Sequence, residues 1–202
     1  MVSVQSDRPD SGQGREELTI PSSVKIVVAG GFGVGKTTMV GAVSEITPLR
    51  TEELLTEAGE EIDDLYGVEG KTTTTVALDF GRITINPELV LYLFGTPGQD
   101  RFWFLWDELA IGSIGAVVLV DTRRLDAGFG AIDFFERRGI PFVVAVNCFQ
   151  GSHSYTAEEM RAALDVADTV PLVLCDARDR ESCKAVLVRV IEHAMNRLDV
   201  MA

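Results

Sequence analysis

A glycine-rich stretch directly after a buried strand is the feature that most constrains how this chain can fold. The apolar run 24–30 is followed by the letters GGFGVGKTT, which satisfy the pattern G-x-x-x-x-G-K-[ST]. The pattern needs a strand before it and a helix after it, because the backbone N–H groups then surround a phosphate at the positive end of the helix. A helical pattern over 37–46 supplies that context. The stretch therefore predicts a phosphate-binding loop; the alternative is a glycine-rich turn with an incidental lysine.

The loop assigns chemistry to individual side chains. Lys36 would reach the β- and γ-phosphates of a nucleoside triphosphate, and the hydroxyl of Thr37 would bind Mg²⁺. The motif does not say which base is bound. The nucleotide-binding residues predicted here are Gly30, Gly31, Phe32, Gly33, Val34, Gly35, Lys36, Thr37 and Thr38.

The rest of the chain alternates between apolar runs and helical patterns. The expected strands cover 24–30, 75–85, 88–95, 114–121, 141–147 and 169–176, and the expected helices cover 37–46, 126–138, 156–164 and 182–198. This alternation predicts an α/β fold of the P-loop NTPase kind, with a doubly wound, mostly parallel six-stranded sheet and helices on both faces. Residues 1–22 are polar and predict a disordered tail, which leaves 23–202 as a single domain.

Composition excludes several classes of protein. The chain has 202 residues and a net charge of −13, which argues against a nucleic-acid partner because such proteins need a basic surface. Its three cysteines are too scattered for a disulfide framework or a zinc site. No apolar run reaches the roughly 18 residues that would span a membrane, and no signal peptide is visible. We expect a cytoplasmic protein that reaches a membrane only through a partner.

The strand over 88–95 ends in the letters FGTPGQD. Together with the phosphate loop, this ending resembles Ras-type small GTPases, in which the corresponding motif is D-x-x-G-Q. The resemblance implies a catalytic set of Lys36, Gly98 and Gln99: the Gly98 N–H would contact the γ-phosphate, and Gln99 would orient the attacking water. The alternative, a Gly-Pro turn that closes a hairpin, explains the glycines but not the glutamine.

One metal-associated position departs from this family. The aspartate of D-x-x-G is Gly95 here, and Asp79 in the neighbouring strand is a candidate substitute that would hold Mg²⁺ through a water. The first switch of the family carries a threonine that binds Mg²⁺; the spacing to Asp79 favours Thr75, with Thr74 as second choice. A threonine run at a strand start is the alternative explanation. Arg101 is a candidate charge stabiliser acting in cis.

The base-recognition loops match the family only in part. The guanine motif N-K-x-D reads N-C-F-Q here, with Asn147, Cys148 and Gln150, and the last loop reads Asp176-Ala177-Arg178. Gln150 cannot reproduce the paired acceptors of a carboxylate, so GTP or GDP is expected from the resemblance and ATP stays open. The Ala177 N–H is a candidate donor to guanine, and Asp176 a candidate carboxylate near the base.

The most specific resemblance is to bacterial Ras-like GTPases of the actinomycete conservon (CvnD) type, and more distantly to the gliding-motility switch MglA. It is carried by FGVGKTT (32–38), KTTTTVALDFGRI (71–83), FGTPGQDRFWFLWDELA (94–110) and VNCF (146–149). It implies a signalling switch that binds GTP and Mg²⁺, with a roadblock/LC7-domain protein and a sensor-kinase-like protein as partners. The rivals are an ATP-using P-loop enzyme and a nucleotide-bound scaffold that does not cycle.

Further side chains bear on rate and partners. Phe32 stands where efficient Ras-like enzymes have glycine, so we expect slow hydrolysis. The aromatic residues at 102, 103, 104 and 106 cannot all face one core, so some should be exposed. The segment either serves core packing alone or forms a hot spot for binding a partner. Cys148 and Cys175 serve either as small apolar residues or as a redox-sensitive pair beside the base.

Eight carboxylates and no basic residue lie between Thr51 and Gly70. The apolar residues from Leu54 to Leu65 recur near helical spacing, so this acidic segment predicts an amphipathic helix. Its charged side is a solvated face or a docking surface beside the first switch.

Overall fold

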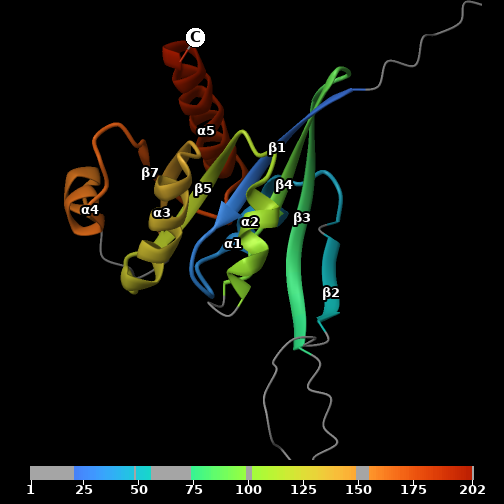
Figure 1. Ribbon diagram of the computed structural model, residues 1–202, viewed down its shortest axis with the longest axis horizontal. Coiled ribbons are helices and arrows are strands. Elements are labelled where there is room, and N and C mark those ends of the chain that lie inside the picture. Colours follow the sequence, from blue (N-terminus) through green and yellow to red (C-terminus); the bar gives the residue numbers. More distant parts are fainter. Residues whose placement is uncertain (1–20, 48, 56–73, 99–101, 149–154, 202) are drawn as a thin grey trace, which may run out of the picture.

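Seven strands form one mixed sheet in the described part of the chain, in the order β2-β3-β4-β1-β5-β6-β7 (Figure 1). The structure is a computed structural model that describes residues 21–47, 49–55, 74–98, 102–148 and 155–201. The strands are β1 (Ser22–Ala29), β2 (Leu49–Leu55), β3 (Thr74–Asn86), β4 (Leu89–Gly95), β5 (Gly115–Asp121), β6 (Phe142–Asn147) and β7 (Leu172–Cys175). The helices are α1 (Lys36–Val43), α2 (Phe104–Ala110), α3 (Asp126–Arg138), α4 (Ala157–Leu164) and α5 (Arg180–Met201).

The order of the strands creates a switch point beside β1. β1 pairs in parallel with both β4 and β5. From β1 the sheet extends in one direction through β4, β3 and β2, and in the other through β5, β6 and β7. β6 and β7 continue the parallel part, whereas β3 runs antiparallel to β2 and β4. Ligands of open α/β sheets bind beyond the carboxyl ends of the strands at such a point.

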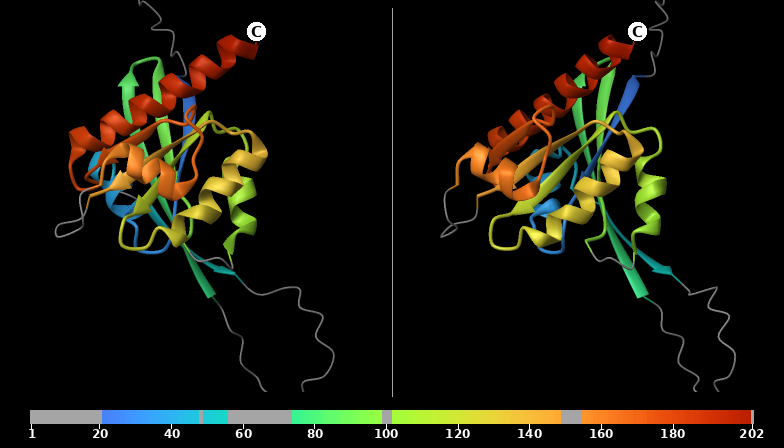
Figure 2. Two further views of the ribbon diagram at one scale, coloured as in Figure 1. Left: turned by 90° about the vertical axis from the view of Figure 1, so that its left-hand side faces the viewer. Right: turned by 60° about the vertical axis from the view of Figure 1, so that its left-hand side comes forward.

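Helices cover both faces of the sheet, as the continuous apolar runs predict. Every residue of β5 and β6 is buried, because each face of these strands packs against helices. One core cluster joins the sheet to α1 and α5, and the other joins it to α2, α3 and α4. Figure 2 shows α5 crossing one side of the sheet while α2 and α3 lie on the other. The α/β doubly wound fold is therefore confirmed.

The six expected strands are all present, and β2 is an additional strand at the sheet edge. Its residues Leu54 and Leu55 pair with Thr75 and Thr74 of β3, so the expected helix is wrong over this stretch. Pairing with the long β3 satisfies the backbone of 49–55 and outweighs the weak helical spacing. The remainder of the acidic segment lies in 56–73, outside the described residues.

Several boundaries also differ from expectation. β1 begins at Ser22, inside the expected polar tail, because the Ser22 N–H donates to the Glu88 carbonyl over 2.7 Å. Residues 1–20 lie outside the described residues. The sequence predicts no helix where α2 lies, whereas α3 and α4 agree with expectation. The capping box of α4 is formed, since the Glu159 N–H donates to Thr156 Oγ1 over 3.2 Å.

None of the described helices combines the length and the apolar character that crossing a membrane would require.

Candidate functional site

The loops that follow β1 and β4 meet in one open cavity of about 430 Å³. This cavity brings together much of the predicted phosphate loop, the metal candidate Asp79 and the ending of β4. It is lined by Phe32, Gly33, Gly35, Lys36, Thr37, Thr38, Asp79, Thr96, Pro97 and Gly98. The predicted loop residues Gly30 and Val34 are buried beneath it.

The phosphate loop has the backbone that the motif requires. Gly30, Gly33 and Gly35 all have positive φ, and α1 begins at Lys36 immediately after the loop. A Cβ on Gly30 would lie 2.3 Å from the carbonyl oxygen of Leu119, so only glycine fits between β1 and β5. The strand-loop-helix context is therefore confirmed, and the N-terminus of α1 faces the cavity that Lys36, Thr37 and Thr38 line.

Lys36 is held at the base of this loop. Its ammonium donates to the carbonyl oxygens of Gly30 and Gly31, each over 2.8 Å. Burial lowers the pKa of Lys36 to about 8, and the negative charge of Asp79 opposes part of that drop. A buried ammonium with two backbone acceptors and a nearby carboxylate is a strong partner for an additional anion.

Asp79 lies where the sequence places a substitute for the missing aspartate. In the antiparallel pair of β3 and β4, Asp79 is directly opposite Gly95, and a Cβ on Gly95 would come within 2.9 Å of Asp79 Cβ. The Asp79 carboxylate therefore fills the space above Gly95 and is almost fully buried. The hydroxyl of Thr37 donates to Asp79 Oδ2 over 2.6 Å.

These oxygens fit a magnesium site that a nucleotide would complete. Mg²⁺ in nucleotide sites is bound by one or two protein oxygens, by phosphates and by waters, rather than by a full cage of carboxylates. Thr37 and Asp79 offer one hydroxyl and one carboxylate, and no cluster of three or more acidic, His or Cys ligands occurs among the described residues.

The ending of β4 packs directly on the phosphate loop. A Cβ on Gly98 would lie 2.7 Å from Lys36 Nζ and 2.8 Å from the backbone nitrogen of Phe32, so this position demands glycine. The neighbouring Thr96 is buried, and its hydroxyl has no hydrogen-bond partner among the described residues. Thr96 lines the same cavity, which makes it a polar group that the sequence analysis missed.

Some predicted site residues cannot be placed. Gln99, Arg101 and Gln150 lie outside the described residues. Thr74 and Thr75 are placed only as backbone positions in β3, and their side chains are likewise outside the described part of the chain. Their roles stay predictions.

Asn147 ties the base-recognition loops to the phosphate loop. Its amide nitrogen donates to the Val34 carbonyl over 2.9 Å, and its amide oxygen accepts from the Ala177 N–H over 3.0 Å. The side chain is almost completely buried. Asn147 therefore acts as a pin between three loops, and both ends of its amide are engaged.

Two groups expected at the base have partners within the protein. The Ala177 N–H donates to Asn147, so a guanine would have to replace that hydrogen bond to use this donor. The carboxylate of Asp176 accepts from the Arg178 guanidinium over 2.7 and 2.8 Å, and these hydrogen bonds lower the pKa of Asp176 to about 2. Arg178 thus neutralises the carboxylate that the sequence offers to the base.

The cysteines are free thiols. Cys148 is exposed, whereas Cys175 is buried at the end of β7. Burial raises the pKa of the Cys175 thiol to about 12, so it stays protonated and unreactive at neutral pH. This arrangement favours the small apolar role over the redox-sensitive pair.

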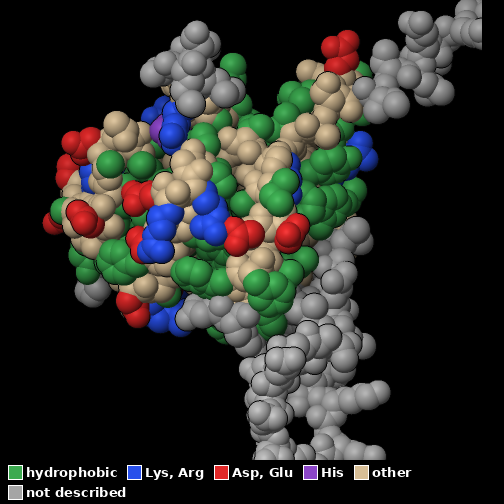
Figure 3. All heavy atoms as spheres, in the orientation of Figure 1, with side chains coloured by type: hydrophobic (Ala, Val, Ile, Leu, Met, Phe, Trp, Pro, Cys, Tyr) green, Lys and Arg blue, Asp and Glu red, His purple; other side chains and the backbone are tan. Residues whose placement is uncertain are grey.

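The aromatic residues after β4 divide between core and surface, as expected. Phe102 and Trp106 are buried, whereas Phe104 and part of Trp103 are exposed. Trp103 and Trp106 stack at 5.3 Å, and Trp106 meets Phe134 of α3 edge-on at 5.3 Å. Figure 3 shows this face, where basic side chains over α3 lie beside acidic ones over α2. One of these pairs joins Arg138 to Asp107.

Solved structures with this fold include two FeoB G domains. The G domain of the FeoB iron transporter of T. maritima matches with a TM-score of 0.59 and 16% identity, covering 86% of this chain and 99% of that one. The FeoB G domain of Methanococcus jannaschii matches with a TM-score of 0.57 and 14% identity, covering 86% and 98%. At these identities the likeness establishes a P-loop, small-GTPase-like fold.

Sequence comparison establishes a family. An uncharacterized protein of Methanocaldococcus jannaschii, MJ1339, is 32% identical over 126 residues, which are 61% of this chain and 69% of that protein. Residues 28–197 match the family described as "Conserved hypothetical ATP binding protein". The matched stretch runs from the last residues of β1, through the phosphate loop, into α5. The chain therefore belongs to this family of conserved hypothetical ATP-binding proteins.

Proposed function

We propose that this chain is a nucleotide-dependent switch that binds GTP with Mg²⁺ and hydrolyses it slowly. The observation that carries the proposal is the convergence of Lys36, Thr37 and Asp79 in one cavity beneath Gly98. A loop of inward-turned N–H groups, a buried ammonium and a hydroxyl paired with a carboxylate together suit the phosphates and the metal of a nucleoside triphosphate.

Each group has a defined task in this proposal. Lys36 binds the β- and γ-phosphates, and the Thr37 hydroxyl and Asp79, the latter through a water, hold the metal. Bound Mg²⁺ would neutralise charge on the β- and γ-oxygens. Gly98 presents its N–H to the γ-phosphate, and Gln99 orients the water that attacks the γ-phosphorus. Thr75 completes the metal site from the first switch.

The position of Gly98 couples the proposed γ-phosphate site to helix α2. Gly98 rests on Lys36 and Phe32, and the next carbonyl back, that of Pro97, accepts from Trp106 Nε1 over 3.2 Å. A γ-phosphate that draws Gly98 into a new position would move Pro97 and hence α2. This coupling supports a switch whose state is read on the α2–α3 face.

The partners belong to this proposal as well. We propose a bacterial, cytoplasmic signalling role in which a roadblock/LC7-domain protein binds the α2–α3 face and a sensor-kinase-like protein acts upstream. The exposed Phe104 and Trp103 support a docking role for that face. Substitution of Phe104 by Ser should weaken capture of the roadblock protein in the triphosphate state, and unchanged binding would contradict this part.

Use of ATP is the second candidate, and specific contacts favour it. The Ala177 N–H and the Asp176 carboxylate, the described groups proposed for guanine, are both engaged within the protein. The family description names ATP. These observations bear on the base and leave the phosphate and metal chemistry unchanged.

Two measurements test the proposal. Unlabelled GTP and ATP compete against a fluorescent GTP in the presence of Mg²⁺; GTP should compete at least tenfold better, and the reverse order would assign ATP. Phosphate release under multiple turnover should then be slow but measurable. Binding without any turnover, also in the presence of the roadblock protein, would favour the non-cycling scaffold.

A further inference from the structure

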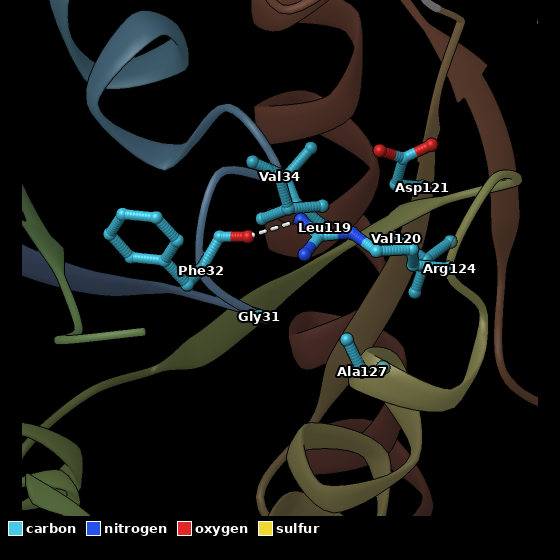
Figure 4. Close-up of a pocket in the computed structure, with 9 residues that line it drawn as sticks. Gly31, Phe32, Val34, Leu119, Val120, Asp121, Arg124 and Ala127 are labelled. Atoms are coloured by element: carbon cyan, nitrogen blue, oxygen red, sulfur yellow. Dashed lines mark hydrogen bonds between the residues drawn. The ribbon is translucent and has the colours of Figure 1, made fainter. Parts of the chain in front are cut away.

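The outer side of the phosphate loop rests on the segment that links β5 to α3. Arg124, two residues before α3, donates from Nη2 to the carbonyl oxygen of Phe32 over 2.6 Å. Figure 4 shows that carbonyl turned toward Arg124 while the Phe32 ring points the other way. One turn later, Ala127 backs the loop so closely that a Cβ on Gly31 would lie 2.7 Å from Ala127 Cβ. The loop is therefore supported from outside as well as from β1.

Arg124 is available for this contact because its neighbour takes the nearby carboxylate. The Arg123 side chain donates to both oxygens of Asp121, over 2.9 Å to Oδ1 and 2.7 Å to Oδ2. Asp121 is buried, and these hydrogen bonds lower its pKa, so it stays ionised and paired. Within the described residues no carboxylate forms an ion pair with Arg124. Of these two adjacent arginines, Arg123 neutralises Asp121 and Arg124 binds the phosphate loop.

The geometry of the peptide bond links this outer contact to the inside of the loop. The bond between Phe32 and Gly33 is planar and trans, so the Phe32 C=O and the Gly33 N–H point in opposite directions. Arg124 holds the C=O on the outer side, and the cavity lined by Gly33, Lys36 and Thr37 lies on the other. The Gly33 N–H is accordingly directed toward that cavity.

The charge of Arg124 also changes the strength of that donor. A hydrogen bond from a guanidinium to a carbonyl is charge-assisted, and hydrogen bonds in series polarise one another. The held carbonyl makes the N–H of the same peptide a better donor to an anion. Gly33 itself has a positive φ of 76°, so the conformation that gives this direction is one that glycine tolerates.

We propose that Arg124 is a positioning residue of the nucleotide site: it aims the Gly33 N–H at the phosphate chain of a nucleoside di- or triphosphate and strengthens that hydrogen bond. Arg124 acts through the Phe32 carbonyl and does not itself touch the nucleotide. This inference rests on the proposed function for the class of ligand, and it adds a residue that neither the loop motif nor the FGTPGQD ending of β4 contains.

The test compares two charge-removing variants. Arg124→Gln removes the donor to Phe32, and Arg189→Gln removes the same charge from the exposed surface of α5, where Arg189 pairs with Glu192. Affinities for fluorescent GDP, GTP and ATP are measured with Mg²⁺ at one salt concentration, and thermal unfolding checks that each variant is folded. Arg124→Gln should weaken binding of the nucleotides that the wild type binds by about five- to tenfold, as expected for one exposed charge-assisted hydrogen bond.

The controls separate positioning from general electrostatics. Arg189→Gln should stay within about twofold of wild type, and Arg124→Lys, which keeps a charged donor, should recover at least half of the lost affinity on a logarithmic scale. Wild-type affinity in Arg124→Gln would overturn the inference alone, as would an equal loss in Arg189→Gln or no recovery with lysine. If the wild-type protein binds none of the three nucleotides, the proposed function fails and the inference fails with it.

Discussion

Moving the Asp79 carboxylate tests the metal site in the most specific way. The Thr37 hydroxyl donates to this nearly buried carboxylate over 2.6 Å, and a charge-assisted hydrogen bond of this kind contributes about 1.5–3 kcal/mol. Asp79→Asn keeps the shape of the side chain and removes its charge. We therefore expect the Mg²⁺ concentration that half-saturates nucleotide binding to rise about ten- to hundredfold. Mg²⁺ titration of the release of a fluorescent triphosphate measures this value directly.

A swap of residues across the strand pair sharpens the test. Gly95→Asp alone should be destabilising by about 1–3 kcal/mol, because its Cβ would lie 2.9 Å from Asp79 Cβ. Asp79→Gly removes that obstacle and the carboxylate together. The double variant returns a carboxylate from the opposite strand, so it should need less Mg²⁺ than Asp79→Gly and be more stable than Gly95→Asp. Strict additivity of the two changes, or an Asp79→Asn protein with wild-type Mg²⁺ dependence, would contradict a metal role for Asp79.

Three further predictions concern the phosphate loop, its lysine and helix α2. Phe32→Gly should raise the single-turnover hydrolysis rate about three- to tenfold: the Phe32 backbone lies beside Gly98, and its exposed ring borders the same cavity, where it would crowd Gln99. An unchanged or lower rate would count against crowding. Since Lys36 has a lowered pKa of about 8 and phosphates favour its protonated form, affinity should fall as pH rises above 8. Competition binding between pH 7 and 9.5 measures this fall, and a flat profile in that range would show that Lys36 keeps its charge throughout. Trp106→Phe removes the hydrogen bond to Pro97 and part of a buried ring, so the free energy of unfolding in urea should fall by about 1–3 kcal/mol. A free energy of unfolding equal to that of the wild type would contradict a stabilising contact between α2 and Pro97.

The phosphate loop was predictable because its geometry is local. Consecutive glycines, a lysine and a threonine between a strand and a helix fix the backbone and the chemistry within nine residues. The buried strands were equally predictable, since their side chains are apolar on both faces of the sheet. The capping box of α4 follows from two residues three positions apart.

What the sequence missed depends on long-range contacts. Asp79 is a plausible metal partner from strand order, but only the register that places it opposite Gly95 shows that the two residues exclude each other's side chains. The sequence offers the Ala177 N–H to the base, whereas in the fold Asn147, at the end of another strand, accepts that hydrogen bond. Of two adjacent arginines, the fold alone reveals which one meets Asp121 and which one reaches the loop.

The edge strand β2 illustrates a different limit. Its letters suit neither an alternating strand nor a strong helix, and the outcome is decided by the exposed edge of β3, which offers a row of backbone partners. The spacing of apolar residues within 49–55 carries no information about this long-range pairing.

In the proposed function, Lys36 and its loop bind the phosphates of a nucleotide. Calorimetry tests this binding by titrating GTP and ATP into wild-type protein and Lys36→Met, with Mg²⁺ present and with Lys184→Met as a control. Lys184 is an α5 residue that pairs with Glu181, away from the cavity lining. We predict binding of at least one triphosphate to wild type and to Lys184→Met, and at least a tenfold loss in Lys36→Met. Equal affinity in Lys36→Met, or no binding by any of the three proteins, would contradict the account.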